Sequence, residues 1–440
     1  MIDYSFDQIA TLTGGVLSLQ GACADTRISS VSIDTRTLAP GALYVPVRGG
    51  AFDGHAFIPQ AFAAGAVLTF SEHEVPFPHV LVPDAVAAFQ TLAHDYRCRF
   101  DIPLVGITGS VGKTTTKEMV SAVLASHFKT HYTKGNLNNQ TGVPQVLFGL
   151  TEQTECAVVE MGTNHFGEID RLAAMSEPTV CLITNIGEAH IEFFGSRAGI
   201  FKGKTEMLPH MRSGGTVIVN GDDDYLCTLQ DTFTYGTGEN CTLRATDILD
   251  KGLLGSDFSA IYRGETYKLT VPVPGRHMVY NALSAMSVGL ILGVPVEKII
   301  GAIATFTQPD GRGAVKHHGE ITIIDDSYNA NPTSMLASLS SLRAVPGRKI
   351  LILGDMLELG VDEDEGHLRV LRAAKDIQDA LILPVGPRMC KAAGLVSLPA
   401  YTEKAVLAKA LPGILEKGDT VFIKGSHGMH LETLIELIGQ

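Results

Sequence analysis

Short apolar runs alternate with helix-like segments along most of the 440-residue chain. Strand-like runs occur at Ile102–Ile107, Cys156–Glu160, Val180–Asn185 and Gly215–Asn220, and the segments between them carry apolar positions at helical spacing. Such alternation is typical of βαβ units, which form a mostly parallel sheet covered by helices. The pattern therefore predicts an α/β protein with a parallel sheet at its centre.

The pattern changes on either side of this central part. Residues 1–84 alternate short strand-like runs with turns and one alanine-rich helical stretch, which predicts a small N-terminal α/β domain. Residues 311–440 carry a second α/β series, which predicts a C-terminal domain of Rossmann-like type. Between them, 85–310 is expected to be the central domain, and 243–273, rich in strand formers and turns, a small antiparallel addition to it. The strand candidates of the C-terminal series are Glu320–Asp325, Lys349–Gly354, Ala380–Val385 and Thr420–Lys424.

Composition narrows the class of protein. The chain is 45% hydrophobic and 18% charged, so each domain can bury a core. A net charge of -13 argues against nucleic acid and acidic membranes as partners, but small anionic substrates remain compatible because a few cations can reverse the potential locally. The seven scattered cysteines form no C-x-x-C pair, and the N-terminus lacks a basic signal region. We therefore expect a cytoplasmic protein without membrane contact, acting as a monomer on small molecules.

The sharpest local signal is the turn ITGSVGKTTT, which follows the run Ile102–Ile107 and opens a helix-like segment. Glycines there let backbone N–H groups surround a phosphate, and the helix N-terminus adds positive partial charge. Lys113 can reach the β- and γ-phosphates, and the Thr114 hydroxyl can ligate Mg²⁺. A strict phosphate loop has glycine where this chain has Ile107. The turn predicts a central P-loop-type domain that binds ATP with Mg²⁺. The expected contacts are Gly109, Ser110, Gly112, Lys113, Thr114 and Thr115.

Two further side chains follow neighbouring strand-like runs. Glu160 ends the run Cys156–Glu160, and ligands in α/β sheets sit beyond the carboxyl ends of strands, so Glu160 is a candidate Mg²⁺ ligand. His190 follows Val180–Asn185. A single histidine after a strand is usually a surface residue or a buried, hydrogen-bonded one. The segment Phe194–Glu206, which comes after His190, favours a functional role for this histidine.

Together these motifs resemble those of the Mur ligases, the amide-forming enzymes of bacterial peptidoglycan precursor synthesis, over essentially the whole chain. The resemblance implies an ATP-dependent, ADP-forming acid–D-amino-acid ligase. Its most specific segment, Asp325–Pro332, implies that D-Ala-D-Ala is joined to the terminal carboxylate of a UDP-MurNAc-tripeptide through an acyl phosphate. The third residue of the tripeptide, diaminopimelate or lysine, stays open. The other matching segments are Ser32–Arg36, Phe52–His55, Gly135–Pro144, Glu160–His165, Gly167–Ile169, Gly275–Ala282, Gly311–Arg312, Gly354–Gly360 and Lys424–Ser426.

The resemblance also assigns substrate contacts. In the N-terminal domain, Arg36 would meet the diphosphate of the UDP-sugar, and Asp34 with Thr35 the uridine end. A turn rich in capping residues is the alternative for this segment. The full set expected to contact substrate is Ser32, Asp34, Thr35, Arg36, Asn136, Asn138, Asn139, Asn329 and Asn331.

A metal centre follows from the same resemblance. Thr114 and Glu160 would hold one Mg²⁺, and His190 a second. Lys204 matches the lysine that CO2 carbamylates in this family, a change that turns a cation into a carboxylate-like metal ligand. Lys202 is the alternative, because the residue between the two lysines is glycine where the family usually has alanine.

Further residues complete the ATP site that the resemblance implies. Asn281 would contact adenine, although capping of the following helix is an alternative. Arg312 would neutralise the transferring phosphoryl group, and Asp326 would hold the ATP ribose. Asn329 and Asn331 would face the incoming dipeptide. The implied catalytic set is Lys113, Glu160, His190, Lys204 and Arg312.

Two other functions share the phosphate loop. Another Mur ligase, or a folylpolyglutamate-type synthetase, would add a different amine, but the latter gives no reason for the segment Asp325–Pro332 or for a UDP-binding front domain. A regulatory P-loop switch would turn over slowly without any amine acceptor. The chain shows no guanine-specifying N/T-K-x-D segment in suitable context, since the nearest stretch, Thr133–Asn136, lacks the aspartate.

Overall fold

The computed structural model describes residues 2–50 and 52–438; residue 1 and residues 439–440, at the ends of the expected terminal domains, and residue 51 lie outside this part. Within it, no helix is long and apolar enough to cross a membrane. The expected domain limits of 1–84, 85–310 and 311–440 stay predictions. By the density of its contacts, the chain divides into two compact units, one of Met1–Ile107, Phe128–Cys181 and Glu206–Gly215, the other of Thr108–His127, Leu182–Thr205 and Thr216–Gln440.

The first part of the chain forms a five-stranded sheet in the order β2-β7-β6-β5-β4, parallel except for the pair β2 and β7. Helix α1 begins at a capping box, in which the Ser5 hydroxyl accepts from the N–H of Gln8. This is the small α/β domain that the sequence predicts. Its elements are β1 Tyr4–Ser5, α1 Phe6–Thr13, β2 Val16–Ser18, β3 Arg27–Ile28, β4 Ser30–Ser32, β5 Ala42–Tyr44, α2 Ile58–Ala63, β6 Ala66–Ser71 and β7 His79–Leu81.

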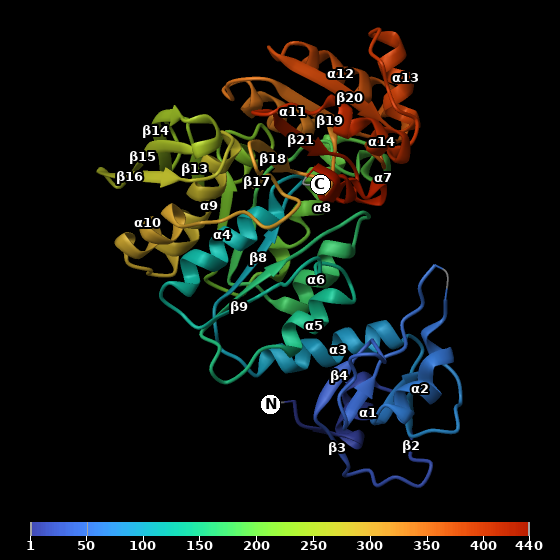
Figure 1. The fold of residues 1–440 in the computed structure, drawn as a ribbon. Coiled ribbons are helices and arrows are strands. Elements are labelled where there is room, and N and C mark those ends of the chain that lie inside the picture. Colours follow the sequence, from blue (N-terminus) through green and yellow to red (C-terminus); the bar gives the residue numbers. More distant parts are fainter. Residues whose placement is uncertain (1, 51, 439–440) are drawn as a thin grey trace. The chain divides into compact units, whose positions relative to one another are not determined.

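A nine-stranded sheet follows in the order β16-β15-β14-β13-β12-β11-β8-β10-β9. Strand β10 is parallel to β8 and β9, and β13 is parallel to β12 and β14, whereas β14, β15 and β16 form the antiparallel edge expected from residues 243–273 (Figure 1). The predicted mostly parallel central sheet is confirmed. Its strands are β8 Leu104–Thr108, β9 Thr130–Tyr132, β10 Cys156–Glu160, β11 Val180–Ile183, β12 Thr216–Asn220, β13 Thr232–Gly236, β14 Leu243–Asp250, β15 Ser256–Tyr262 and β16 Glu265–Val271.

The helices of this central part bury most of their apolar residues. Helix α9 packs on α4 and lies along β12 to β16, and Gly289 lets the helices approach closely, since a Cβ there would be 2.9 Å from Val123. Helix α9 is therefore a core helix of this part of the chain. The helices are α3 Ala85–Cys98, α4 Lys113–Ala125, α5 Gly142–Phe148, α6 Glu168–Ser176, α7 Ile191–Phe194, α8 Arg197–Thr205, α9 His277–Ile291 and α10 Val296–Ala304.

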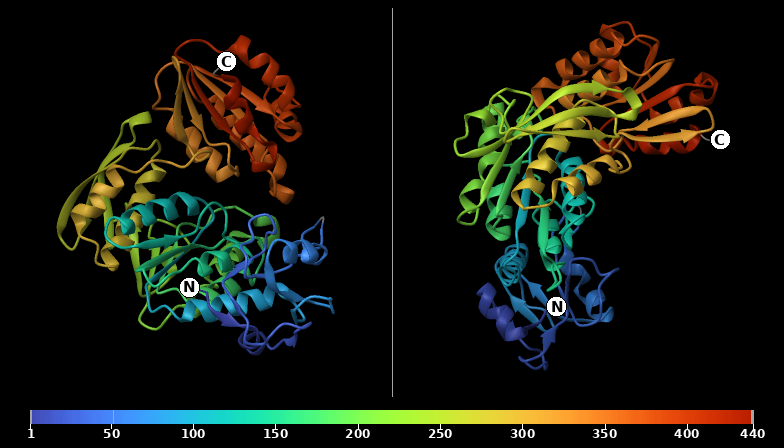
Figure 2. Two further views of the ribbon diagram at one scale, coloured as in Figure 1. Left: turned by 60° about the horizontal axis from the view of Figure 1, so that its bottom comes forward. Right: turned by 90° about the vertical axis from the view of Figure 1, so that its left-hand side faces the viewer.

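The C-terminal part is a five-stranded sheet in the order β17-β18-β21-β19-β20, parallel except for β17. Alternate residues of β19 face opposite layers: Leu351 packs with α11, α12 and α13, and Ile350 with α14 and α15. Figure 2 shows this sheet, in orange and red, between its helices. The Rossmann-like prediction is confirmed. The elements are β17 Ala314–His318, β18 Ile321–Asp325, α11 Pro332–Leu342, β19 Lys349–Gly354, α12 Glu363–Lys375, β20 Ala380–Val385, α13 Pro387–Leu395, α14 Lys404–Ile414, β21 Thr420–Lys424 and α15 Ile435–Ile438.

Candidate active site

The glycine-rich turn lies between β8 and the N-terminus of α4, as a phosphate loop requires. Gly109 has φ +148°, and a Cβ at this position would lie 1.9 Å from Oγ1 of Thr184, so only glycine fits. Gly112, with φ +82°, occupies the N-cap of α4 and brings no side chain to it. Because Gly112 has no side chain that could cover the N-terminus of α4, the positive end of the helix dipole stays accessible. This arrangement suits an anionic ligand.

Residues at the end of β11 hold this loop in shape. The N–H groups of Ser110 and Val111 donate to the carbonyl and to Oδ1 of Asn185, each at 3.0 Å. The Val111 carbonyl accepts from Thr184 Oγ1 at 2.8 Å and from Asn185 Nδ2 at 2.9 Å, and Ser110 Oγ accepts from the N–H of Gly187. Ser110 therefore uses its N–H and its hydroxyl within the protein. The sequence did not predict these contacts between the loop and the end of β11.

Two lysines of the same compact unit influence one another. Nζ of Lys113 donates to the Gly109 carbonyl at 2.8 Å, so the side chain folds over the loop. Lys204, on α8, is 1% exposed. Burial and, second, the charge of Lys113 hold the pKa of Lys204 well below its usual range. Lys202, on the same helix, is exposed. Of the two lysines that the sequence left open, Lys204 is the buried one, with the lowered pKa.

The glycine between these lysines is explained by its surroundings. A Cβ at Gly203 would lie 2.5 Å from the ring of Phe194, at the end of α7, so alanine does not fit beside this ring. Local packing between α7 and α8 thus explains why Gly203 stands where the family usually has alanine. It leaves Lys204 on the buried side of α8.

Glu160 ends β10 beside the strand that carries the loop. It is 1% exposed, and its register partner is Ile107, the residue before the turn. Oε1 of Glu160 accepts from Nδ2 of Asn138 at 2.8 Å, and its N–H donates to Oγ1 of Thr133 at 3.0 Å. The structure thus brings two of the predicted site residues, Asn138 and Glu160, together. A buried carboxylate oriented by a neutral amide is a suitable ligand for a hard cation.

The neighbouring asparagines have different roles. Oδ1 of Asn139 accepts from the N–H groups of Thr141 and Gly142, at 3.2 and 2.9 Å, and so shapes the turn that leads into α5. Asn136 is exposed, and its carbonyl accepts from the N–H of Asn138 at 2.8 Å. Of the three predicted asparagines, Asn138 is the one whose side chain contacts another predicted site residue.

His190 contacts a residue from the C-terminal part of the chain. It has φ +60° at the N-cap of α7, and its Nδ1 lies 3.0 Å from Oε2 of Glu358. Close by in sequence, Glu188 pairs with Arg369 of α12 at 2.6 Å. Sequence reasoning missed Glu358, although it lies in the matching segment Gly354–Gly360. This places a carboxylate beside the imidazole that the resemblance assigned to metal.

Asn281 lies inside α9, whose N-cap is Arg276, so the capping alternative is wrong. Its Oδ1 accepts from Oγ1 of Thr116 at 3.2 Å, and its Nδ2 donates to Sδ of Met278 at 3.4 Å. A Cβ on Gly112 would lie 3.4 Å from the same Oδ1. The amide therefore joins α9 to α4 directly behind the loop. Its contact with adenine stays a prediction.

The residue proposed to hold the ribose is part of an ion pair. Oδ2 of Asp326, directly after β18, accepts from Nζ of Lys424 at 2.7 Å and from Oγ of Ser338 at 2.8 Å. The Lys424 ammonium also donates to the carbonyl of Asn329 at 3.1 Å. The structure thus groups Asp326 and Asn329 around Lys424, which the sequence had placed only in a matching segment.

Arg312 and Asn331 differ in how their side chains are engaged. The guanidinium carbon of Arg312 lies 3.9 Å from the centroid of the Tyr328 ring, a cation–π arrangement that keeps the charge at the surface of this segment. Asn331 is the N-cap of α11, and its Oδ1 accepts from the N–H of Ser334 at 2.9 Å. Asn331 therefore has a structural role, whereas Asn329 is exposed.

In the N-terminal domain the predicted UDP-binding turn is ordered by its own side chains. Arg36 and Asp34 form an ion pair at 2.7 Å, and Ser32 Oγ accepts from the Asp34 N–H at 3.1 Å. Side-chain and then backbone hydrogen bonds from Arg36 lower the pKa of Asp34 to about 2. The capping-turn alternative describes this geometry, with Thr35 half-buried between the two charges. The Arg36 side chain is still 83% exposed and accessible to an anion.

Comparisons with known proteins show which protein family the chain resembles. Three family models match it: "Mur ligase family, catalytic domain" at 27–93, "Mur ligase middle domain" at 107–289 and "Mur ligase, glutamate ligase domain" at 311–427. The UDP-N-acetylmuramoyl-tripeptide--D-alanyl-D-alanine ligase of Bacillus subtilis is 34% identical, over 99% of this chain and 98% of the relative.

Solved structures agree with these sequence matches. A crystal structure of MurF from Acinetobacter baumannii superposes with a TM-score of 0.93 at 30% identity, covering 100% of this chain and 99% of that one. The MurF ligase of Thermotoga maritima in complex with ADP has a TM-score of 0.84 at 26% identity, covering 93% and 97%. The fold, the phosphate loop and the full-length similarity lead to one conclusion: the chain belongs to the Mur ligase family.

Proposed function

We propose that this chain joins the amine of D-Ala-D-Ala to the terminal carboxylate of UDP-MurNAc-tripeptide, with ATP converted to ADP and phosphate, in the synthesis of peptidoglycan precursors. As a Mur ligase it is an ATP-dependent, ADP-forming ligase. The observation that carries the choice of substrates is the similarity, over 99% of the chain, to a relative named for this reaction. Every motif residue that the proposal uses is present in this chain.

The first step transfers the γ-phosphoryl group. A carboxylate oxygen of the tripeptide bonds to the γ-phosphorus, the bond between that phosphorus and the β–γ bridging oxygen breaks, and ADP leaves an acyl phosphate behind. Negative charge accumulates on the phosphoryl oxygens in this transition state. Lys113, folded over the loop, and the N-terminus of α4 offset that charge. We assign Arg312 to the same group of oxygens from the C-terminal part of the chain.

The second step forms the amide. The amine of D-Ala-D-Ala attacks the carbonyl carbon, and the tetrahedral intermediate expels phosphate when its C–O bond breaks. The amine loses a proton in this step, and the asparagines of the site cannot accept it. Asn329, exposed beside Lys424, is assigned to the incoming dipeptide, with Asn331 at the start of α11 next to it.

The donor set fits Mg²⁺. Thr114 supplies a hydroxyl on the first turn of α4, Glu160 a buried carboxylate, and His190 an imidazole beside Glu358. The hydroxyl and carboxylate oxygens suit a hard divalent cation, and the imidazole would add a nitrogen ligand. When bound by these residues, Mg²⁺ would neutralise charge on the triphosphate. The residues assigned to it are Thr114, Glu160, His190 and the carbamylated form of Lys204.

The burial of Lys204 supports its carbamylation. The neutral amine adds to CO2 through its lone pair, a C–N bond forms, and a proton leaves the nitrogen to give a carbamate anion. An ammonium group has no lone pair for this reaction. The lowered pKa of Lys204 therefore favours the reactive form. The product places an anion near the charge of Lys113, which is electrostatically more favourable there than a second cation.

The remaining assignments concern the UDP-sugar part of the substrate and the cellular compartment. Exposed Arg36 is assigned to the UDP diphosphate, with Ser32, Asp34 and Thr35 forming the turn that presents it. Asn136, Asn138 and Asn139 are assigned to peptide and phosphate groups.

The seven free cysteines and the use of ATP fit the cytoplasm, with the chain acting as a monomer.

Phosphate release from Mg-ATP tests the proposal when each co-substrate is added singly and then together, with the product mass recorded. We expect turnover only with both UDP-MurNAc-tripeptide and D-Ala-D-Ala, and a product whose mass equals their sum minus one water. D-Ala-D-Ala with an acetylated amine is the matched control and should support no amide formation. Full turnover without the dipeptide, or with a different amine alone, would refute the substrate assignment.

A further inference from the structure

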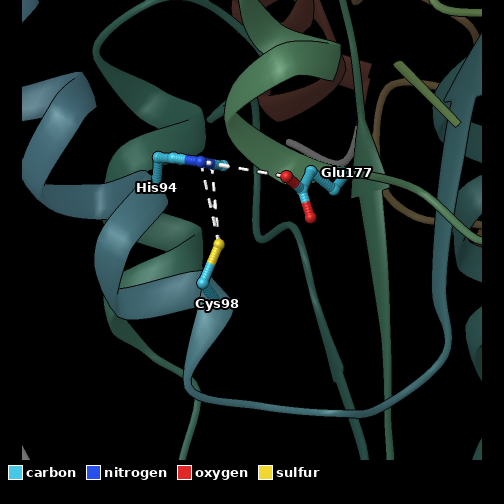
Figure 3. Close-up of side chains that lie close together, drawn as sticks. All are labelled: His94, Cys98 and Glu177. Atoms are coloured by element: carbon cyan, nitrogen blue, oxygen red, sulfur yellow. Dashed lines mark hydrogen bonds and ion pairs between the residues drawn. The ribbon is translucent and has the colours of Figure 1, made fainter. Parts of the chain in front are cut away.

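Three side chains with metal-ligating atoms, none assigned to the ligase reaction, lie together at one end of α3. His94 and Cys98 are four residues apart and so share one face of this helix. Glu177 follows α6 and points toward them (Figure 3). One ligating atom from each residue lies within 4.8 Å of the other two. The three belong to the same compact unit.

The distances approach those of a tetrahedral metal centre. Zn²⁺ binds sulfur at about 2.3 Å and nitrogen or oxygen at about 2.0 to 2.2 Å, which places a sulfur and a nitrogen ligand about 3.6 Å apart. Sγ of Cys98 lies 3.7 Å from Nε2 of His94, and this Nε2 lies 3.8 Å from Oε1 of Glu177. Small side-chain rotations would bring all three atoms onto one ion.

Neighbouring groups already orient two of the three ligands. Nδ1 of His94 lies 3.2 Å from the carbonyl of Met175, and a proton on Nδ1 would leave the lone pair of Nε2 available to a metal ion. Nε of Arg212 donates to Oε2 of Glu177 at 3.1 Å, while Oε1 is the oxygen near His94. Backbone carbonyls and charged groups that hold ligands in this way are typical of protein metal sites.

The chemistry of the donors selects the metal. A thiolate is a soft ligand, so the combination of sulfur, imidazole and carboxylate favours Zn²⁺ over Mg²⁺. Burial and, second, Glu177 raise the pKa of Cys98, so the metal must displace a proton from this thiol. The side chains of His94 and Glu177 are 40% and 35% exposed, which gives an ion access from solvent. We propose that His94, Cys98 and Glu177 bind Zn²⁺, with water as the fourth ligand, at a site separate from the proposed Mg²⁺ ligands.

Cobalt titration of the full-length chain, freed of metal with a chelator, tests the proposal. Co²⁺ bound by a thiolate gives a sulfur-to-metal charge-transfer band, which oxygen and nitrogen ligands do not produce. We expect one such band per chain, removed by stoichiometric Zn²⁺ and unaffected by Mg²⁺. Cys98→Ser should abolish the band. Cys23→Ser, which changes another exposed cysteine, should retain it.

Zinc affinity measured by competition with a chromophoric chelator supplies the second readout. His94→Ala should weaken binding at least about tenfold, and Glu177→Gln should weaken it in the same direction. Thermal unfolding without metal checks that each variant is folded. A parent chain without the band, a band that survives in Cys98→Ser, or equal affinity in His94→Ala would overturn the proposal. None of these outcomes depends on the ligase reaction, so the two proposals fail independently.

Discussion

Lys113→Ala should lower kcat/KM for ATP by at least about 100-fold, the loss typical when one preorganised group that stabilises transition-state charge is removed. The ammonium lies over the phosphate loop through its bond to the Gly109 carbonyl and has no replacement at that position once truncated. Lys113→Arg should also be impaired, because the planar guanidinium does not reproduce a compact ammonium. Steady-state phosphate release at varied ATP concentration measures both variants.

A matched lysine change separates this effect from loss of net charge. Lys298, exposed on α10 of the same compact unit, is replaced by alanine as the control. Lys298→Ala should keep kcat/KM within about twofold of the parent, because an exposed charge contributes little through solvent. If Lys113→Ala remained folded and as active as Lys298→Ala, the assignment of the phosphate loop would be wrong.

Lys204→Met should reduce turnover by at least about 100-fold, because methionine keeps the length and much of the volume of the buried side chain but cannot add CO2. Retained volume limits the cavity that alanine would create. The activity assay is run with added bicarbonate, so that the parent is fully carbamylated. Thermal unfolding establishes that the variant is folded.

The carbamate itself is observed by ¹³C NMR after exposure to ¹³C-bicarbonate. The parent should give one carbamate carbon signal, and Lys204→Met should lose it. Lys202→Met, which changes the exposed lysine two residues away, should retain both the signal and the activity. Loss of the signal in Lys202→Met with retention in Lys204→Met would assign the modification to the other lysine.

The sequence predicted those parts of the fold that depend on local pattern. β10, β19, β20 and β21 begin and end at the predicted residues, because apolar runs bounded by turn residues define buried parallel strands. The short strands β9 and β13 and the edge strand β17 were not predicted. The position of β21 between β18 and β19 depends on pairing across nearly a hundred residues, which periodicity does not encode.

The sequence likewise predicted the part of the candidate site that lies in one short segment, but not the contacts between distant residues. The phosphate loop was found because one short segment carries the chemistry. Asn185, Glu358 and Lys424 were not assigned roles, because each acts through a side-chain contact with a residue distant in sequence. The cluster of His94, Cys98 and Glu177 had one local sign, the spacing of histidine and cysteine on a helix. Its third member joins only through the packing of α6 against α3.

The most direct test of the central claim follows the oxygen atoms of the tripeptide. UDP-MurNAc-tripeptide labelled with ¹⁸O in its terminal carboxylate is incubated with the chain, Mg-ATP and D-Ala-D-Ala, and the released phosphate is examined by mass spectrometry. Because the acyl phosphate expels phosphate with one carboxylate oxygen, we predict one ¹⁸O in each phosphate and one in each new amide. Phosphate without ¹⁸O, released while ATP is consumed, would contradict the account and identify a nucleotide hydrolase instead.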